Sequence, residues 1–218
     1  MEEKRIMHYS SFHNILLVGE GDFSFSLSLA RAFGSAVNMV ATSLDSRESL
    51  VLQYGSASSN LNELEALGCT ILHNVDVHNM SEHHYLNNKS FHRIIFNFPH
   101  AGFDYRESNE FQILLHRRLV SGFLKSAKCI LAPVEGEIHV SHKTSHPFSK
   151  WDIEGLAENE ELVFIEEVDF QQSDYPGYSN KRGSGLQCDQ SFPIGKSSTF
   201  KFITFKSFGY IDFMLPFF

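Results

Sequence analysis

Short apolar runs alternate with amphipathic segments along most of the chain, and this alternation predicts its secondary structure. The first apolar run, residues 15–18, leads directly into Gly19-Glu20-Gly21-Asp22. A helical pattern follows this turn and ends near Gly34. Four consecutive apolar residues are typical of a strand that is buried on both faces. The segment is therefore predicted to form a buried strand, a tight glycine turn and a helix.

The rest of the chain repeats this order. Further strands are predicted over residues 37–43, 69–75, 91–98, 136–142, 162–170 and 199–205. Helices are predicted over residues 60–67, 108–128 and 150–159. Strands that alternate with helices predict an α/β fold with a mostly parallel seven-stranded sheet and helices on both faces. Only a long loop separates the last two strands, so they are expected to form an antiparallel hairpin at one edge of the sheet.

The domain organisation predicted from these patterns is simple. A chain of 218 residues is expected to form one domain, here over residues 13–206. Residues 1–12 are polar and are expected to be a mobile lead-in. Residues 207–218 change composition abruptly to an atypical apolar tail.

Composition narrows the function classes. The formal net charge of −8 argues against broad non-specific binding to nucleic acids, although a local basic patch remains compatible with it. No stretch of about 18 apolar residues is present, so no membrane association is expected. Three scattered cysteines without C-x-x-C spacing predict reduced thiols in an intracellular protein, with neither a zinc cluster nor a disulfide framework.

Polar residues stand at the carboxyl ends of the first four predicted strands. These ends carry Gly19-Glu20-Gly21-Asp22, then Asp45, Asp76 and Asn97-Phe98-Pro99-His100. Ligands of open parallel sheets bind at this edge, where Asp45 is placed to accept hydrogen bonds from a ribose and Asp76 to meet an adenine amino group. The glycine pattern is incomplete, since Ser24 replaces the third glycine of G-x-G-x-x-G. The ligand is therefore a dinucleotide or S-adenosylmethionine.

The fourth strand end favours S-adenosylmethionine. A dehydrogenase has no need of a polar, aromatic and proline clamp such as Asn97-Phe98-Pro99-His100 at this position. An enzyme that methylates a planar nitrogen does, because the Asn oxygen can accept a hydrogen bond from the target and a ring can stack on it. Enzymes that extrude a base from a nucleic acid hold it in this way.

Several segments resemble one known family, the eukaryotic 25S ribosomal RNA uridine-N3 methyltransferases and their plant relatives. The resemblance spans roughly residues 13–206 and rests on residues 18–26, 41–45, 94–100, 136–140 and 175–178. It implies a Rossmann-like class I methyltransferase fold and S-adenosylmethionine as the methyl donor. It also implies methylation of N3 of a uridine in large-subunit ribosomal RNA, in the nucleolus or nucleus, with the cytoplasm as the alternative. The loop 101–110 and the tail 207–218 depart from the usual family pattern.

The resemblance and the strand ends together give candidate site residues. Those expected to hold the cofactor are Gly19, Glu20, Gly21, Asp22, Phe23, Ser24, Asp45 and Asp76. Those expected to contact the target base are Asn97, Phe98, Pro99 and His100. Those expected to bind RNA are Lys143, Tyr175, Tyr178, Lys181 and Arg182.

His100 is the candidate general base, because an imidazole with a pKa of about 6.5 can take the N3 proton at neutral pH. No metal is expected in this reaction. Two alternatives stay open. One is a catalytically silent paralogue that retains S-adenosylmethionine binding for a regulatory or binding role. The other is a nucleotide-dependent oxidoreductase.

Overall fold

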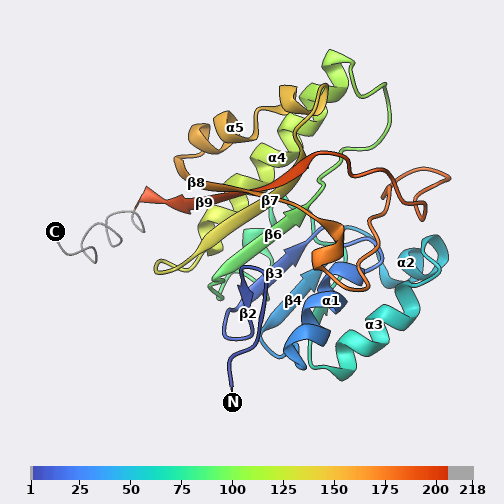
Figure 1. Cartoon of the computed structure of the whole chain (residues 1–218), viewed down its shortest axis with the longest axis vertical. Coiled ribbons are helices and arrows are strands. Elements are labelled where there is room, and N and C mark those ends of the chain that lie inside the picture. The colour runs from blue at the N-terminus through green and yellow to red at the C-terminus, as the bar shows by residue number, and fades with distance from the viewer. Residues whose placement is uncertain (1, 206–218) are drawn as a thin grey trace, which may run out of the picture.

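The structure, a computed structural model, describes residues 2–205 and is built on a seven-stranded sheet (Figure 1). The strand order is β5-β4-β3-β6-β7-β9-β8. The strands are β3 Ile15–Val18, β4 Met39–Thr42, β5 Thr70–Leu72, β6 Arg93–Asn97, β7 Glu137–Lys143, β8 Leu162–Asp169 and β9 Ser197–Thr204. Strands β3 to β7 pair in parallel, and β9 runs antiparallel to both β7 and β8. This confirms the predicted mostly parallel sheet and its antiparallel edge hairpin.

Helices cover both faces of the sheet (Figure 1). They are α1 Ser24–Phe33, α2 Arg47–Gln53, α3 Ala57–Ala66, α4 Glu110–Ile130 and α5 Ile153–Asn159, with short 3₁₀ turns at Met80–Glu82, Phe148–Trp151 and Gln172–Asp174. Alternate residues of β3 enter the two apolar cores. Ile15 and Leu17 pack in the core that contains α1, α2 and α3, whereas Leu16 and Val18 pack in the core that contains α4 and α5. This is why the first apolar run has no polar position.

Some predicted element boundaries differ from the observed ones. The third predicted strand is cut to Thr70–Leu72, because Asn74 adopts a left-handed conformation with φ of 57° that turns the chain away from the sheet. The predicted helix over residues 60–67 begins earlier, at Ala57. Helix α4 begins at Glu110, after Asn109, whose side chain accepts a hydrogen bond from the Phe111 amide.

The predicted lead-in contains a small antiparallel hairpin of β1 Arg5–Ile6 and β2 Tyr9–Ser10. Tyr9 is buried, and its ring lies 6.3 Å from that of Phe25. The hairpin therefore packs on the domain, while the boundary at residue 12 and the mobility of residues 1–12 stay predictions. The predicted apolar tail over residues 207–218 lies outside the described residues. No helix among the described residues is long and apolar enough to cross a membrane.

Candidate functional site

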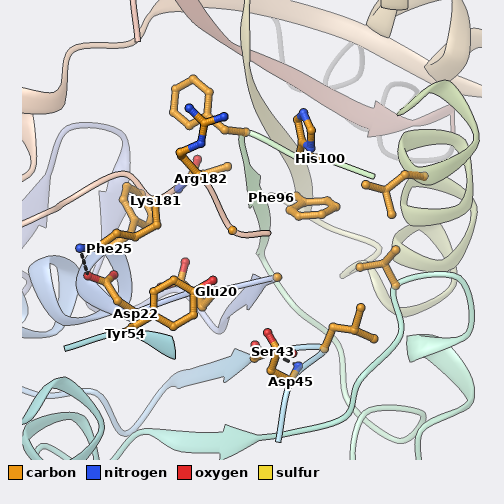
Figure 2. A pocket seen from close by; sticks show the side chains of 18 of the residues that line it. Glu20, Asp22, Phe25, Ser43, Asp45, Tyr54, Phe96, His100, Lys181 and Arg182 are labelled. Carbon is orange, nitrogen blue, oxygen red and sulfur yellow. Dashed lines mark hydrogen bonds and ion pairs between the residues drawn. The ribbon is translucent and has the colours of Figure 1, made fainter. Parts of the chain in front are cut away.

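A cavity of about 310 Å³ opens at the carboxyl ends of β3, β4 and β6. Figure 2 shows Glu20 and Asp22 from the glycine turn on one side of it, Ser43 and Asp45 from the end of β4 below, and His100 above. The long loop after β8 contributes a further wall with Tyr178, Ser179, Lys181, Arg182 and Gly183. A volume of this size lies at the lower end of the range for small-molecule sites. The predicted strand-end residues thus meet at one cavity.

The glycine turn approaches two aromatic rings closely. Gly19 has φ of +67°, and a Cβ atom there would lie 2.5 Å from a ring carbon of Phe96. A Cβ atom at Gly21 would lie 3.3 Å from the Tyr54 ring. Only glycine combines the left-handed conformation with this close approach at position 19. The turn therefore packs closely against these two rings in the wall of the cavity.

We predict that Gly19→Ala lowers the free energy of unfolding by about 2–4 kcal/mol, from left-handed strain and overpacking against Phe96. Gly102→Ala is the matched control, because Gly102 has φ of +89° but a Cβ atom there would meet nothing within 4 Å. Urea unfolding of both variants separates the two effects. Equal destabilisation of the two variants would show that the contact with Phe96 has no cost.

Glu20 is a buried acid of the cavity, and its pKa is raised. Its side chain is 9% exposed, and Oε2 accepts hydrogen bonds from the amide and the hydroxyl of Ser26, 3.1 and 2.8 Å away. Burial raises the pKa of Glu20 to about 7, against the opposing effect of these hydrogen bonds. A cationic ligand in the cavity would favour the ionised carboxylate.

The raised pKa of Glu20 predicts a pH-dependent stability. The folded chain holds a proton that the unfolded chain releases near pH 4.5, so the free energy of unfolding falls as pH rises from 4.5 to about 7. The fall amounts to at most about 3 kcal/mol, since each pKa unit corresponds to about 1.4 kcal/mol. Urea unfolding of the wild-type chain and of Glu20→Gln between pH 5 and 8 measures it. If the free energies of unfolding of the wild type and of Glu20→Gln differ by the same amount at every pH, the prediction is contradicted.

The three aspartates of the cavity differ in how far they are engaged. The Asp45 carboxylate makes no hydrogen bond or ion pair with any described residue. Asp22 accepts hydrogen bonds from the Ser24 amide and the Ser56 hydroxyl, which tie the glycine turn to α3. One oxygen of Asp76 accepts from the amide and Nδ1 of His78. Asp45 is therefore the carboxylate most available to a ligand.

Two of the predicted cofactor residues do not line the cavity. Phe23 is fully buried, and its φ of 61° places its side chain in the core beneath the turn. The Ser24 hydroxyl exchanges hydrogen bonds with the backbone of Ser179, accepting from its amide at 3.0 Å and donating to its carbonyl at 3.2 Å. Their side chains are thus engaged within the fold, and their role in cofactor binding stays a prediction. Ser24 instead fastens the long loop to the start of α1.

The clamp predicted at the end of β6 lies between two cavities. Asn97, Phe98 and His100 line the first cavity, and Phe98, Pro99 and His100 line a second one of about 320 Å³. Both side-chain polar atoms of Asn97 are buried without a hydrogen-bond partner among the described residues. Unpaired buried polar atoms are costly. They fit a site whose partner is a ligand.

His100 has a carboxylate partner that the sequence patterns did not indicate. Its Nε2 lies 2.7 Å from Glu107 Oε1, and His116 Nε2 lies 3.3 Å from Glu107 Oε2. Burial raises the pKa of Glu107, but its contacts with the two histidines outweigh this and lower the pKa to about 2. Glu107 is therefore an acceptor-only carboxylate at neutral pH.

These three side chains could suggest a metal centre, since their ligand atoms lie within 4.8 Å of one another. However, the Ala101 amide donates a hydrogen bond to His116 Nδ1 at 3.1 Å. The side-chain amide nitrogen of Gln112, which also donates to the Gly102 carbonyl, lies 3.1 Å from His116 Nε2. Both ring nitrogens of His116 therefore already face a hydrogen-bonding group of the chain. The expectation that the reaction uses no metal stays a prediction.

The residues expected to bind RNA fall into two groups. Lys143, Tyr178, Lys181 and Arg182 line one or both cavities, whereas Tyr175 lines neither. Lys181 also lies 2.7 Å from Asp189 Oδ1 and 3.7 Å from Asp22 Oδ2 (Figure 2). Its charge is therefore used to hold the long loop over the glycine turn.

The structure does not support the predicted role of Tyr175 in RNA binding. Its ring is 3% exposed and stacks on Phe170 with a centroid distance of 5.4 Å, while Phe25 lies 4.8 Å away. The ring is therefore buried in the hydrophobic core. The prediction that Tyr175 stacks on an RNA base is therefore wrong, whereas Tyr178 remains a candidate.

The site also contains aromatic residues that the sequence patterns did not single out. Tyr54 lines the first cavity, Phe148 and Trp151 line the second, and Phe192 lines both. They come from the end of α2, the turn before α5 and the long loop. No local motif marks them, because only the tertiary fold brings these elements together.

A family profile described as rRNA (uridine-N3-)-methyltransferase BTM5-like matches residues 16–182. The chain belongs to this BMT5-like family. The matched region begins in β3 and ends at Arg182. It therefore includes the glycine turn, the end of β4 and the end of β6, all of which line the first cavity. The fold and the family are those of a methyltransferase.

Two relatives illustrate the range of this similarity. "Heavy metal-associated isoprenylated plant protein 41" of Arabidopsis thaliana is 54% identical over 92% of this chain, and the chain spans 39% of that protein. The 25S rRNA (uridine(2634)-N(3))-methyltransferase of Saccharomyces cerevisiae is 25% identical over 86% of this chain and 71% of its own length. BMT5-like sequence is thus present both in a much longer plant protein and in a yeast RNA methyltransferase.

Solved structures share the fold at low sequence identity. The 16S rRNA (adenine(1408)-N(1))-methyltransferase from Catenulisporales acidiphilia has a TM-score of 0.53 and 11% identity, with 88% of each chain covered. The SMU.776 structure, complexed with SAH, has a TM-score of 0.51 and 15% identity, and covers 87% of this chain and 44% of that one. These likenesses agree with the Rossmann-like class I architecture.

Proposed function

We propose that this chain transfers a methyl group from S-adenosylmethionine to N3 of a uridine in large-subunit ribosomal RNA. The observation that carries the proposal is the position of Phe98 and His100 at the junction of two cavities, with Asn97 beside them in the first, in a chain of the BMT5-like family. One cavity has the residues for a nucleoside cofactor, and the other has aromatic walls. Nitrogen methylation requires that two ligands meet at such a junction.

The residues of the first cavity fit S-adenosylmethionine. Gly19 and Gly21 line this cavity and would lie along the methionine part, and the buried Glu20 carboxyl would face its positive charge. The free carboxylate of Asp45 would accept hydrogen bonds from the ribose hydroxyls, and Asp76 from the adenine amino group. When bound there, the cofactor would supply an electrophilic methyl group.

The clamp would hold and activate the target. The amide of Asn97 has a donor and an acceptor without partners, which suit the edge of a uracil ring. Uridine N3 carries a proton and is a poor nucleophile when neutral. His100 would take that proton, so that N3 can form the new bond to carbon. Positioning of the two reacting atoms would provide the remaining rate enhancement.

The proposal also implies a partner and a place. Ribosomal RNA would be the macromolecular substrate, and large-subunit RNA is assembled in the nucleolus, so we propose action in the nucleolus or nucleus. The similarity to the yeast 25S rRNA enzyme supports both statements. The net charge of −8 makes local contacts at the cavity mouth more important than a general basic surface.

A methyl-transfer assay tests this function. The full chain is incubated with methyl-labelled S-adenosylmethionine and large-subunit RNA that lacks N3-methyluridine, and the RNA is digested to nucleosides. We expect label in N3-methyluridine. Binding of S-adenosylmethionine without any transfer would favour the catalytically silent paralogue instead. Label in a different nucleoside would contradict the proposed target.

A further inference from the structure

The second cavity has the walls of a site for a planar group. It is lined by the aromatic rings of Phe98, Phe103, Phe148, Trp151 and Phe192, and it shares His100 with the first cavity. Aromatic walls of this kind stack on nucleic-acid bases without regard to base identity. A ring held in this cavity would therefore lie beside the position proposed for the methyl donor.

Two cations stand at this cavity without a carboxylate partner in the described part of the chain. Lys143 Nζ lies 4.8 Å from the ring centre of Phe148 and 4.7 Å from that of Phe192. Arg182 Cζ lies 4.9 Å from the ring centre of Phe103. Both cations lie over the faces of aromatic rings. A ring face binds a cation more weakly than a carboxylate does. In an acidic chain, two such cations are available for an incoming phosphate.

The hydrogen bond between His100 and Glu107 fixes where the imidazole carries its proton. The Glu107 carboxylate can only accept, so His100 Nε2–H donates to it across 2.7 Å. In the neutral imidazole, Nδ1 then has a lone pair. This Nδ1 atom has no hydrogen-bond partner among the described residues. A base oriented by a neighbouring carboxylate in this way is a recurring arrangement in catalysis.

We propose that the second cavity binds one RNA base with its phosphates on Lys143 and Arg182, and that Glu107 makes it selective for a base with a ring N–H. This inference rests on the proposed function and names the acceptor subsite of that reaction. Uracil N3–H can donate to His100 Nδ1. Cytosine N3 has a lone pair instead, so two acceptors would face each other. Glu107 is a positioning residue here, since it acts through His100.

Binding of short RNAs tests the cavity. Three single-stranded RNAs, identical except for a central uridine, cytidine or abasic site, are titrated against the full chain with S-adenosylhomocysteine present. We expect the uridine RNA to bind about tenfold more tightly than the abasic RNA, from stacking. Lys143→Gln and Arg182→Gln should weaken all three RNAs to a similar extent. Equal affinity for the uridine and abasic RNAs would overturn the assignment of the cavity.

The role of Glu107 is tested with the same RNAs and with one spectroscopic readout. Glu107→Leu should remove the preference for uridine over cytidine, while Glu107→Gln, whose amide oxygen can still accept from Nε2–H, should retain part of it. Glu110→Leu, an exposed neighbour at the start of α4, is the matched control. Nitrogen NMR of the ¹⁵N-histidine-labelled chain should show His100 protonated on Nε2 in the wild type and a mixture of tautomers in Glu107→Leu.

The outcomes separate this inference from the proposed function. If Glu107→Leu keeps the preference for uridine, or if wild-type His100 carries its proton on Nδ1, the role of Glu107 is overturned. Should Glu107→Leu fail to fold, the Glu107→Gln variant and the wild-type NMR spectrum still decide. Normal binding of S-adenosylmethionine together with no selectivity among the RNAs contradicts only this inference. A failure to bind S-adenosylmethionine contradicts the proposed function itself.

Discussion

Replacing Asp45 with alanine is expected to weaken binding of S-adenosylmethionine at least about 100-fold, because two hydrogen bonds from the ribose to a charged acceptor are lost. The Asp45 carboxylate has no partner among the described residues and lies in the first cavity. Its removal should therefore leave the stability of the chain nearly unchanged. Isothermal titration calorimetry of the full chain measures the affinity, and urea unfolding measures the stability.

Two further variants sharpen this prediction. Asp45→Asn keeps one oxygen acceptor but no charge, so its affinity should lie between those of the wild type and Asp45→Ala. Asp169→Ala removes an exposed aspartate at the end of β8 and should bind like the wild type. Wild-type affinity in Asp45→Ala would show that the ribose lies elsewhere.

Replacing His100 with alanine is expected to lower the rate of methyl transfer by about 100-fold to 10,000-fold, which is the usual contribution of a general base. The affinity for S-adenosylmethionine should change little, because His100 lies on the far side of the first cavity from Asp45 (Figure 2). Single-turnover transfer to undermodified large-subunit RNA, at saturating cofactor, measures the chemical step directly.

His84→Ala is the control for this experiment, because His84 is exposed and lines neither cavity. It should retain wild-type rates. A His100→Ala enzyme with full activity would rule out His100 as the base. A loss of rate accompanied by an equal loss of cofactor affinity would point to a structural role of the ring.

The strand-end residues of the first cavity could be predicted because each lies at or shortly after the end of a strand in the sequence. In a parallel sheet, each strand brings its carboxyl end to the same edge, so the residues after each strand must meet there. Gly19, Asp45, Asp76 and Asn97 were each found by this rule, and all line the first cavity. Their positions follow from the strand order alone.

The lining of the second cavity could not be predicted in the same way. Glu107, Trp151 and Phe192 come from loops and turns whose positions depend on how α4 and the long loop pack. Glu107 stands in the loop 101–110, which carries no strong structural pattern. Its pairing with His100 becomes visible only in three dimensions. Local sequence patterns contain little information about contacts of this kind.

Two polar segments of the chain contain residues that are buried or paired in the structure, although local polarity predicts exposure. Tyr175 and Lys181 lie in a long polar loop, and such residues are usually exposed to solvent. Here the loop folds back on the glycine turn, so Tyr175 enters the core and Lys181 pairs with Asp189 and Asp22. The β1–β2 hairpin likewise packs on the domain through Tyr9. Tertiary burial overrode the local polarity in each case.

Calorimetric titration of the full chain with S-adenosylmethionine tests the central claim most directly. We predict one binding site per chain, displacement by S-adenosylhomocysteine, and no measurable binding of NAD⁺ or NADP⁺ under the same conditions. Binding of a nicotinamide dinucleotide in place of S-adenosylmethionine, or no binding of S-adenosylmethionine at all, would contradict the assignment of the cavity at the carboxyl edge of the sheet.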